Sequence, residues 1–412
     1  MNEVASNKAL QIAVIGAGPV GLALALQAAR ALPDAHITVF DARAADKDVS
    51  ADPRTLALSI GSVQLLERLG AWRPEAAQPI LEVHVSQQPP SLLPLLGDVF
   101  GEPELRICAI DEAVPMLGAV LSYGRIVAPL QQVWMAAEAA EPARLHSRFG
   151  QPVAALKNLA DGVEVDAGIA ERFDLAIVAE GGVFAGQARQ ALDLKDHAPL
   201  RHDYHQTAWV GTVKFEPGEP GERARGVAFE RFTRHGPAAL LPLADGGAGL
   251  VWCVTSDDDP VRELNDAQRV TVLNSIFHPS TGHIASISPL KSFPLGLIAE
   301  RTLTDGRTVR IGNAAQTLHP VAGQGLNLGL RDAFELVQAL SRNADVSAVL
   351  RRLEWQRGPD RWAMIAATDF LARSFTWKLP GAGAARGLGI AALQVLSPLK
   401  SAIARQMMFG SR

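Results

Sequence analysis

Two glycine-rich stretches of the sequence carry the residue types that bind phosphate groups and flat rings. In the first, Gly16, Gly18 and Gly21 follow the spacing G-x-G-x-x-G, and Asp41 lies 20 residues after Gly21. Glycine at these positions makes a tight turn, lets the backbone approach a pyrophosphate and allows a helix to pack close to a strand. An acid at this distance accepts hydrogen bonds from a ribose, so the pattern predicts a dinucleotide site.

The elements that must position these residues are visible on both sides of the glycines. Residues 12–15 form an apolar run typical of a buried strand, an Ala- and Leu-rich helix follows the turn, and a second apolar strand over 36–40 ends at Asp41. This order predicts a βαβ unit whose helix begins at the phosphate. Because NAD and FAD share the ADP half, the motif leaves both open, and a glycine turn without a ligand is the alternative.

The uncharged run over residues 9–29 has a second interpretation, as a signal peptide or a membrane span. Gly16, Gly18 and Pro19 interrupt the middle of this run. Such residues would break a single helix, so the pattern favours the strand, turn and helix of the βαβ unit.

The second glycine-rich stretch, residues 310–336, reads RIGNAAQTLHPVAGQGLNLGLRDAFEL. Between Ile311 and Leu330 it has no Lys, Arg, Asp or Glu, although it holds four glycines. We predict a strand over 308–311, a loop, a glycine turn and a helix running toward Leu340. A helix N-terminus beside glycine backbone stabilises negative charge, and a reduced flavin is anionic near N1, so the stretch suits the isoalloxazine half of FAD.

This second stretch resembles the second FAD motif of the class A flavoprotein aromatic hydroxylases. The resemblance is closest to the branch that hydroxylates ubiquinone precursors. Further segments agree with that branch: DPRTLALSIGSVQLLERLGAW from Asp52, FERFTRHGPAALLPLADGGAGLVW from Phe229, SFPLGL from Ser292 and the C-terminal LPGAGAARGLGIAALQVLSPLKSAIARQMMFG. The resemblance therefore covers nearly the whole chain.

The resemblance implies roles for individual residues. Arg54 would lie near the pyrophosphate and the flavin, Asn313 at the ribityl–phosphate linker, and the helix from Leu326 at the N1–O2 edge of the ring. The residues expected to bind the cofactor are Gly16, Gly18, Gly21, Asp41, Arg54, Glu180, Asn313, Ala314, Gly323, Gln324, Gly325, Leu326 and Asn327. Pro320 would line the ring, and His319 is either a catalytic base or, as we favour, a histidine that orients the loop.

Glu180 departs from the family pattern, which usually has Asp in this motif after a central strand. Here the segment reads LAIVAEGG, so the carboxylate is kept and its side chain is one methylene longer. The departure leaves open whether the nicotinamide cofactor is used in the usual way.

By this resemblance, the protein is an FAD-dependent aromatic-ring monooxygenase that binds FAD non-covalently and takes electrons from NAD(P)H. In the family, the reduced flavin reacts with O2 to form a C4a-hydroperoxide, which hydroxylates the ring. The implied substrate is a polyprenylated phenol of ubiquinone biosynthesis. Two alternatives remain: a flavin hydroxylase or reductase that acts on a small soluble phenol, and a non-catalytic scaffold member of a biosynthetic complex.

The fold expected is α/β, with a Rossmann-like FAD-binding domain built on a doubly wound, mostly parallel sheet. An inserted antiparallel-sheet substrate domain and a C-terminal helical tail complete it. The boundaries expected are 1–85, 105–200 and 300–340 for a discontinuous FAD-binding domain, 86–104 for an excursion, 201–299 for the substrate-binding sheet and 341–412 for the helical region.

The composition and the charge of the sequence limit the kinds of partner and ligand that we expect. The net charge of −4 and the lack of a long basic run argue against nucleic acid, and two cysteines are typical of a reducing cytosol. His202 and His205 lack further ligands, so we expect no metal site. The tail from Leu379, with apolar residues at helical spacing from Leu388, predicts either a helix on the inner membrane surface or packing against the body or a second subunit. A homo-oligomer and contacts with other ubiquinone-biosynthesis proteins stay open.

Overall fold

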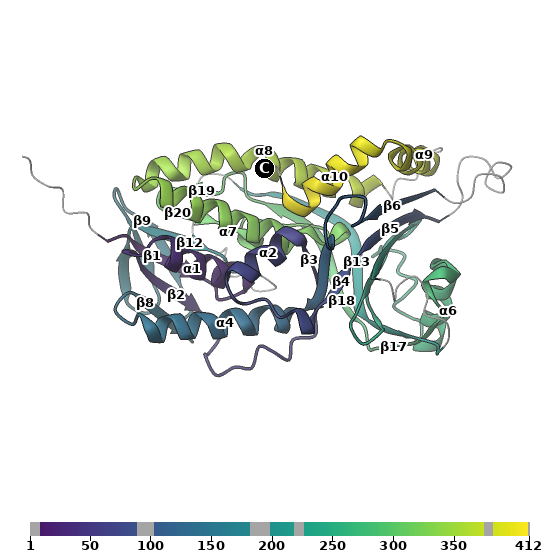
Figure 1. Cartoon of the computed structure of the whole chain (residues 1–412), viewed down its shortest axis with the longest axis horizontal. Helices are drawn as coiled ribbons and strands as arrows, with labels where there is room; N and C mark the ends of the chain where they lie inside the picture. Colours follow the sequence, from purple (N-terminus) through teal and green to yellow (C-terminus); the bar gives the residue numbers. More distant parts are fainter. Residues whose placement is uncertain (1–8, 89–102, 182–197, 218–225, 375–381, 411–412) are drawn as a thin grey trace, which may run out of the picture.

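A six-stranded sheet forms the first layer of the structure, a computed structural model that describes residues 9–88, 103–181, 198–217, 226–374 and 382–410 (Figure 1). Its strand order is β19-β20-β12-β1-β2-β8, parallel except for β19. The strands are β1 (Gln11–Ile15), β2 (His36–Asp41), β8 (Leu145–Phe149), β12 (Leu175–Val178), β19 (Thr304–Asp305) and β20 (Thr308–Arg310). The apolar runs read from the sequence are thus the central strands.

Both faces of this sheet are covered, which explains why its central strands, over residues 12–15 and 175–178, are apolar throughout rather than alternating. Helices α1 (Pro19–Ala31), α4 (Tyr123–Ala140) and α7 (Gln324–Arg342) cover one face. A three-stranded meander covers the other, with β9 (Ala155–Asn158), β10 (Val163–Asp166) and β11 (Ala170–Phe173). The expected Rossmann-like architecture is confirmed, with a small sheet in place of helices on its second face.

A larger sheet of nine strands forms the second part of the molecule. Its order is β21-β18-β13-β16-β15-β14-β5-β6, with β17 paired to β13, and β14 and β5 are its parallel pair. The strands are β5 (Glu82–Gln87), β6 (Glu104–Cys108), β13 (Leu200–Phe215), β14 (Val227–Thr233), β15 (Gly236–Pro242), β16 (Ala248–Thr255), β17 (Ile284–Ile287), β18 (Lys291–Ala299) and β21 (Gln316–Thr317).

The two faces of this sheet have different neighbours. On the outer face, Phe229 and Trp252 belong to an apolar core with residues of α6 (Asp266–Ile276). On the inner face, Ala228 packs toward the C-terminal helices and Phe232 contacts Val321 in the second glycine-rich loop. Because side chains alternate along a strand, the inner face is the side of the sheet turned to that loop.

Two segments that we expected in the FAD-binding domain pair in the other sheet. The domain boundaries themselves remain a prediction. Residues 82–85 and 105–108 were expected in the FAD-binding part, but they lie in β5 and β6 of the nine-stranded sheet. Most of the expected excursion, residues 89–102, lies outside the described residues. Local sequence could not assign β5 to this sheet because β14, the strand that joins it to the rest of the sheet, is more than a hundred residues away.

Smaller elements connect the two large sheets. A three-stranded sheet consists of β3 (Thr55–Ser59), β7 (Gly118–Ser122) and β4 (Gln78–Ile80), and β3 leads directly into α2 (Ile60–Arg68). Short 3-10 turns are η1 (Pro74–Ala76), η3 (Pro279–Thr281), η4 (Gly312–Ala314) and η5 (Val321–Gly323).

The C-terminal part consists of α8 (Val346–Ser374), α9 (Ala382–Val395) and α10 (Ser397–Phe409), and the last two lie over β5 and β6 (Figure 1). In the described residues, no single helix is long and apolar enough to cross a membrane. The pair α9 and α10 meets the length and composition criteria together, but with a bend of 95° between the helices.

A buried ionic cluster joins α7 to α8. Arg357 donates to Asp332 at 2.8 Å and to Asp360 at 2.6 Å, and all three side chains are at least 95% buried. Gln316 also donates to Asp332, at 3.4 Å, from the strand that enters the second glycine-rich loop. The cluster therefore fixes the helix that follows this loop.

Replacing Arg357 by Met leaves Asp332 and Asp360 buried without their common partner. We expect the free energy of unfolding to fall by about 3–5 kcal/mol, because an uncompensated buried charge remains. The midpoint of guanidinium unfolding measures the change. Arg172→Met, at the exposed ion pair with Asp161, is the control and should cost about 1 kcal/mol or less. Equal effects of the two substitutions would contradict this account of the cluster.

Candidate active site

The first glycine loop is packed so tightly that two of its glycines have no room for a side chain. Gly16 follows β1 with φ +106°, and a Cβ there would lie 2.9 Å from the backbone of Glu180. A Cβ on Gly21 would lie 1.9 Å from the carbonyl oxygen of Gly16. For Gly18, the nearest described atom to such a Cβ is the Tyr123 hydroxyl, at 3.5 Å. The loop is closed toward the protein and open at Gly18.

Asp41 lies beside this loop at the carboxyl end of β2. Its carboxylate accepts the Ala17 N–H at 2.6 Å and the Arg43 N–H at 2.7 Å. The Arg43 guanidinium in turn donates to the Ala17 carbonyl oxygen at 3.0 Å. The structure thus places the predicted ribose-binding acid next to the glycine turn, with its carboxylate held by backbone.

Glu180 lies across the loop from Asp41, at the carboxyl end of β12. Burial, and then the negative charge of Asp41, raise the pKa of Glu180 above its usual value. The next residue, Gly181, reaches the second glycine-rich stretch, because a Cβ there would lie 2.5 Å from Cβ of Asn313. The unusual Glu therefore sits where the two stretches meet.

The second glycine-rich stretch packs directly on the first. Gly312 has φ +59°, and a Cβ on Gly329 of α7 would lie 2.8 Å from Cα of Gly312 and 2.8 Å from Cγ2 of Val20. Val20 belongs to the first turn of α1. This close contact of α1 with α7 brings both glycine loops to one side of the molecule.

The turn at which α7 begins has free space beside its glycines, as the first loop has at Gly18. Gly323 has φ +60° in the left-handed region, which favours glycine. For Gly325, the nearest described atom to a Cβ would be Oδ1 of Asn313, at 3.9 Å. Ala314 is buried below this turn, while the Asn313 side chain is exposed.

The N-termini of α1 and α7 differ from those of three other helices. A side chain caps α2, α4 and α6, contributed by Ser59, Ser122 and Asn265. Among the described residues, neither α1 nor α7 has a side-chain cap or an acid in its first turn. Their first N–H groups therefore suit an anionic ligand, and together with the open glycines this arrangement fits FAD.

Asn327 lies in the first turns of α7, where the sequence predicts a cofactor-binding residue. Its Oδ1 accepts the Ser59 N–H and the Ser62 hydroxyl, both at 2.8 Å. Its Nδ2 donates to the carbonyl oxygens of Ala57 and Gly323, both at 3.1 Å. The side chain thus holds the glycine turn against β3 and α2, so any contact with a cofactor is left to its backbone. Gln324 is buried in the same turn, and Leu326 packs partly on the core.

Arg54 lies on the segment that enters β3, near the open side of the first loop. Its guanidinium carbon lies 4.2 Å from the centroid of the Tyr123 ring, and its Nη2 contacts Asp52 at 2.8 Å. The hydrogen bond to Asp52 raises the pKa of Arg54. Because the Tyr123 hydroxyl faces Gly18, Arg54 lies close to the expected pyrophosphate. Sequence reasoning missed Tyr123 and Asp52, and no spacing rule connects Tyr123 to Arg54.

His319 is almost completely buried, with 1% of its surface exposed. Its Nδ1 accepts the Val321 N–H at 3.1 Å, and its Nε2 lies 3.0 Å from Oε1 of Gln206. Gln206 donates its Nε2 to the Ala372 carbonyl oxygen, which orients Oε1 toward the histidine. The imidazole is therefore neutral with the proton on Nε2, and burial lowers its pKa to about 4. Nε2 thus ties the loop to β13 and Nδ1 braces the loop itself, and Pro320 follows directly in the same loop.

The inner face of the nine-stranded sheet stands opposite this loop. A cross-strand row on it runs through Val210, Val251, Ala239, Glu230 and Val85. Glu230 is the charged side chain among these five, and Lys291 of β18 pairs with Val210 at the end of the row. The row thus offers small apolar side chains around a single carboxylate, a surface suited to a flat phenol ring.

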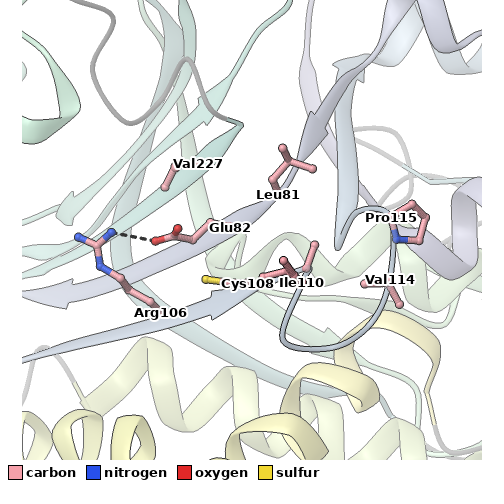
Figure 2. A pocket seen from close by; sticks show the side chains of 9 residues that line it. Leu81, Glu82, Arg106, Cys108, Ile110, Val114, Pro115 and Val227 are labelled. Carbon is pink, nitrogen blue, oxygen red and sulfur yellow. Dashed lines mark hydrogen bonds and ion pairs between the residues drawn. The ribbon is translucent and has the colours of Figure 1, made fainter.

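A surface groove of about 420 Å³ lies elsewhere, where β5 begins and β6 ends, beside the loop that follows β6 (Figure 2). Leu81, Ile110 and Val114 form its apolar wall, and Glu82 pairs with Arg106 at 2.9 Å at its other end. The lining includes none of the predicted cofactor residues. The described residues also contain no group of His, Cys, Asp and Glu arranged to hold a metal ion.

The chain is similar to known proteins in its sequence and in its fold. Residues 127–365 match the family described as FAD binding domain. The chain is 30% identical to the ubiquinone hydroxylase UbiL of Rhodospirillum rubrum, over 98% of this chain and 90% of that protein. It is also 30% identical to the 3-demethoxyubiquinol 3-hydroxylase of Escherichia coli, over 96% of this chain and 97% of that protein.

The solved structure of Klebsiella pneumoniae HpxO with FAD and uric acid has the same fold, with a TM-score of 0.73 at 16% identity over 99% of each chain. The chain belongs to the FAD-dependent aromatic-ring monooxygenases. Within that class it is a member of the ubiquinone-biosynthesis hydroxylases, which confirms the resemblance seen in the sequence.

Gly21→Ala places a methyl group against the Gly16 carbonyl and should push α1 away from the loop. We expect FAD binding to weaken by about tenfold or more, since forcing a methyl group into such a contact costs about 1–3 kcal/mol. Titration of the apoprotein with FAD, followed by flavin fluorescence, measures the affinity. Gly358→Ala on α8 is the control, because no described atom beyond its chain neighbours and the backbone of its own helix lies within 4 Å of its added Cβ. Unchanged affinity in Gly21→Ala would contradict the assigned packing.

The lowered pKa of His319 predicts how stability depends on pH. The unfolded chain binds a proton below about pH 6.5, whereas the folded chain resists it down to about pH 4. Stability is therefore lost as the pH falls between these values, by about 3 kcal/mol for this group. His319→Gln should flatten that part of the curve of melting temperature against pH, whereas substitution of the exposed His283 should not. Parallel curves for all three proteins would contradict the assignment.

Proposed function

We propose that the protein hydroxylates the aromatic ring of a polyprenylated phenol in ubiquinone biosynthesis, using NAD(P)H and O2. One observation carries the proposal: two uncapped helix N-termini with open glycine turns belong to helices packed on each other, and the loop before the second contacts the inner face of a large sheet. The similarity to two hydroxylases named for ubiquinone chemistry supports the choice of substrate.

We propose that the two loops divide FAD between them. Gly16, Gly18 and Gly21 would hold the pyrophosphate, and Asp41 the ribose of the ADP half. Arg54 would neutralise phosphate charge from its place over Tyr123. Gly323, Gln324, Gly325 and the backbone at Leu326 and Asn327 would line the flavin, with Asn313 and Ala314 at the linker. When bound, FAD supplies the electron and oxygen transfer.

The remaining residues would arrange the substrate and exclude water. Pro320 and the neutral His319 form the loop edge that faces the sheet, and the histidine holds this edge through both ring nitrogens. The inner-face row of Val210, Val251 and Ala239 would cover the phenol ring and keep water from the reacting flavin. Glu180, coupled to Asp41, would modulate the negative charge near the ADP half.

The cellular setting follows from such a substrate. A polyprenylated phenol resides in a membrane, so we propose that the protein works in the cytoplasm at the inner membrane surface. Contacts with other ubiquinone-biosynthesis proteins and self-association belong to the same proposal.

The test is turnover by the FAD-loaded protein. We expect NAD(P)H oxidation to accelerate when a short-chain prenylated phenol is added, with a product heavier by one oxygen atom in mass spectrometry. Simple water-soluble phenols serve as controls. Faster turnover of these than of the prenylated phenol would favour a hydroxylase of small phenols. A protein that takes up no FAD would contradict the enzyme proposal and favour the scaffold alternative.

A further inference from the structure

The outward surface of the last two helices is unusually apolar. Leu388 and Val395 of α9 are 62% and 80% exposed, and Leu396, Leu399 and Ile403 are 51%, 48% and 37% exposed. We name these five side chains the C-terminal ridge. Isolated exposed apolar residues are ordinary, but a group of this size on adjoining turns marks an interaction surface.

The opposite side of α9 is also apolar. Ile390 and Leu393 pack on a buried cluster that includes Leu105 and Ile107 of β6. The sequence has no charged residue from Gly387 to Leu399. A helix on the surface of a globular protein normally has one polar face, and α9 has apolar residues on both.

The side chains around the ridge are positively charged, which favours an anionic partner. From Phe370 to Arg412 the sequence has six Lys and Arg and no Asp or Glu, although the whole chain carries a net charge of −4. On α10, the Arg405 side chain is 63% exposed and lies 3.4 Å from the carboxylate of the buried Glu112. Lys400 donates to the Arg106 carbonyl oxygen at 3.3 Å. Apolar side chains flanked by cations match the surface of an anionic bilayer.

The buried cluster beneath α9 continues toward the proposed ring site. It includes Leu105, which lies opposite Val85 at the end of the inner-face row. It also contacts Ala57, and a Cβ added at Gly323 of the flavin loop would lie 3.7 Å from the Ala57 side chain. Apolar side chains therefore run from the inner side of α9, opposite the ridge, to the loop.

We propose that the C-terminal ridge docks on a bilayer containing anionic lipids, and that an isoprenoid tail reaches the ring site beneath α9. The observations that support docking are the exposed apolar side chains of the ridge and the cations beside them. The path of the isoprenoid tail rests on the proposed function. The bent pair of α9 and α10 would lie along the surface, with Leu388, Val395 and Leu399 among the acyl chains.

The experiment uses the full-length, FAD-loaded protein and vesicles of phosphatidylcholine with or without phosphatidylglycerol. We expect the protein to float with the anionic vesicles, and to do so less at high salt or with phosphatidylcholine alone. The double variant Val395→Glu/Leu399→Glu should bind at least about tenfold more weakly, since two apolar anchors are lost. Ile169→Glu is the control, because Ile169 is 77% exposed in the turn before β11.

Equal vesicle binding by the double variant and the control, or none by the wild type, would overturn the docking proposal. A wild-type dimer that the double variant converts to monomer, without vesicle binding, would assign the ridge to a second copy and would overturn it too. Turnover of a short-chain prenylated phenol in solution separates the two proposals. The double variant should retain it, and its absence in the wild type would contradict the proposed function whatever the vesicles show.

Discussion

The contact between α1 and α7 is the constraint on which the site depends. Gly329 approaches Gly312 and Val20 so closely that a single methyl group would separate the helices. Each helix begins at a glycine turn, and both turns are open to a ligand on one side. A dinucleotide needs its phosphates and its ring held at a fixed separation, and this contact sets the separation. Gly312 and Gly329 are therefore required by packing, whereas Gly323 and Gly325 belong to the turn for which we propose ligand binding.

The low charge of that stretch has an electrostatic reason. The helix N-terminus of α7 contributes a partial positive charge, which a nearby acid would neutralise. His319 is kept neutral by burial and adds no charge of its own. The ions that stabilise the region lie one layer deeper, where Arg357 joins Asp332 and Asp360. The molecule thus separates the charges that fix α7 from the dipole that would face the flavin.

Much of this organisation could be predicted from the sequence because it is local. The spacing of Gly16, Gly18, Gly21 and Asp41 defines a βαβ unit, and the glycine turn before α7 was expected at its observed place. The resemblance to ubiquinone-biosynthesis hydroxylases identified the family to which the chain belongs. These features depend on residues within about thirty positions of one another, where turn and helix preferences dominate.

The other features of the fold and of the site could not be predicted from the sequence, because they depend on contacts between distant segments. Asn327 was expected at the cofactor, and only the fold shows its side chain bonded to Ser59 and Ser62. The pairing of β5 with β14 and the stacking of Arg54 on Tyr123 likewise have no local signal. A strand is assigned to a sheet by the surface it buries, and that surface exists only in the folded chain.

A crystal structure of the FAD-loaded protein tests the central claim most directly. The account predicts density for the pyrophosphate at Gly16 and Gly18 and for the isoalloxazine ring at the Gly323–Gly325 turn, with the α1–α7 contact unchanged. It would be contradicted by a flavin bound away from either loop, for example in the groove beside Leu81 and Arg106, or by α1 and α7 moving apart to admit the cofactor.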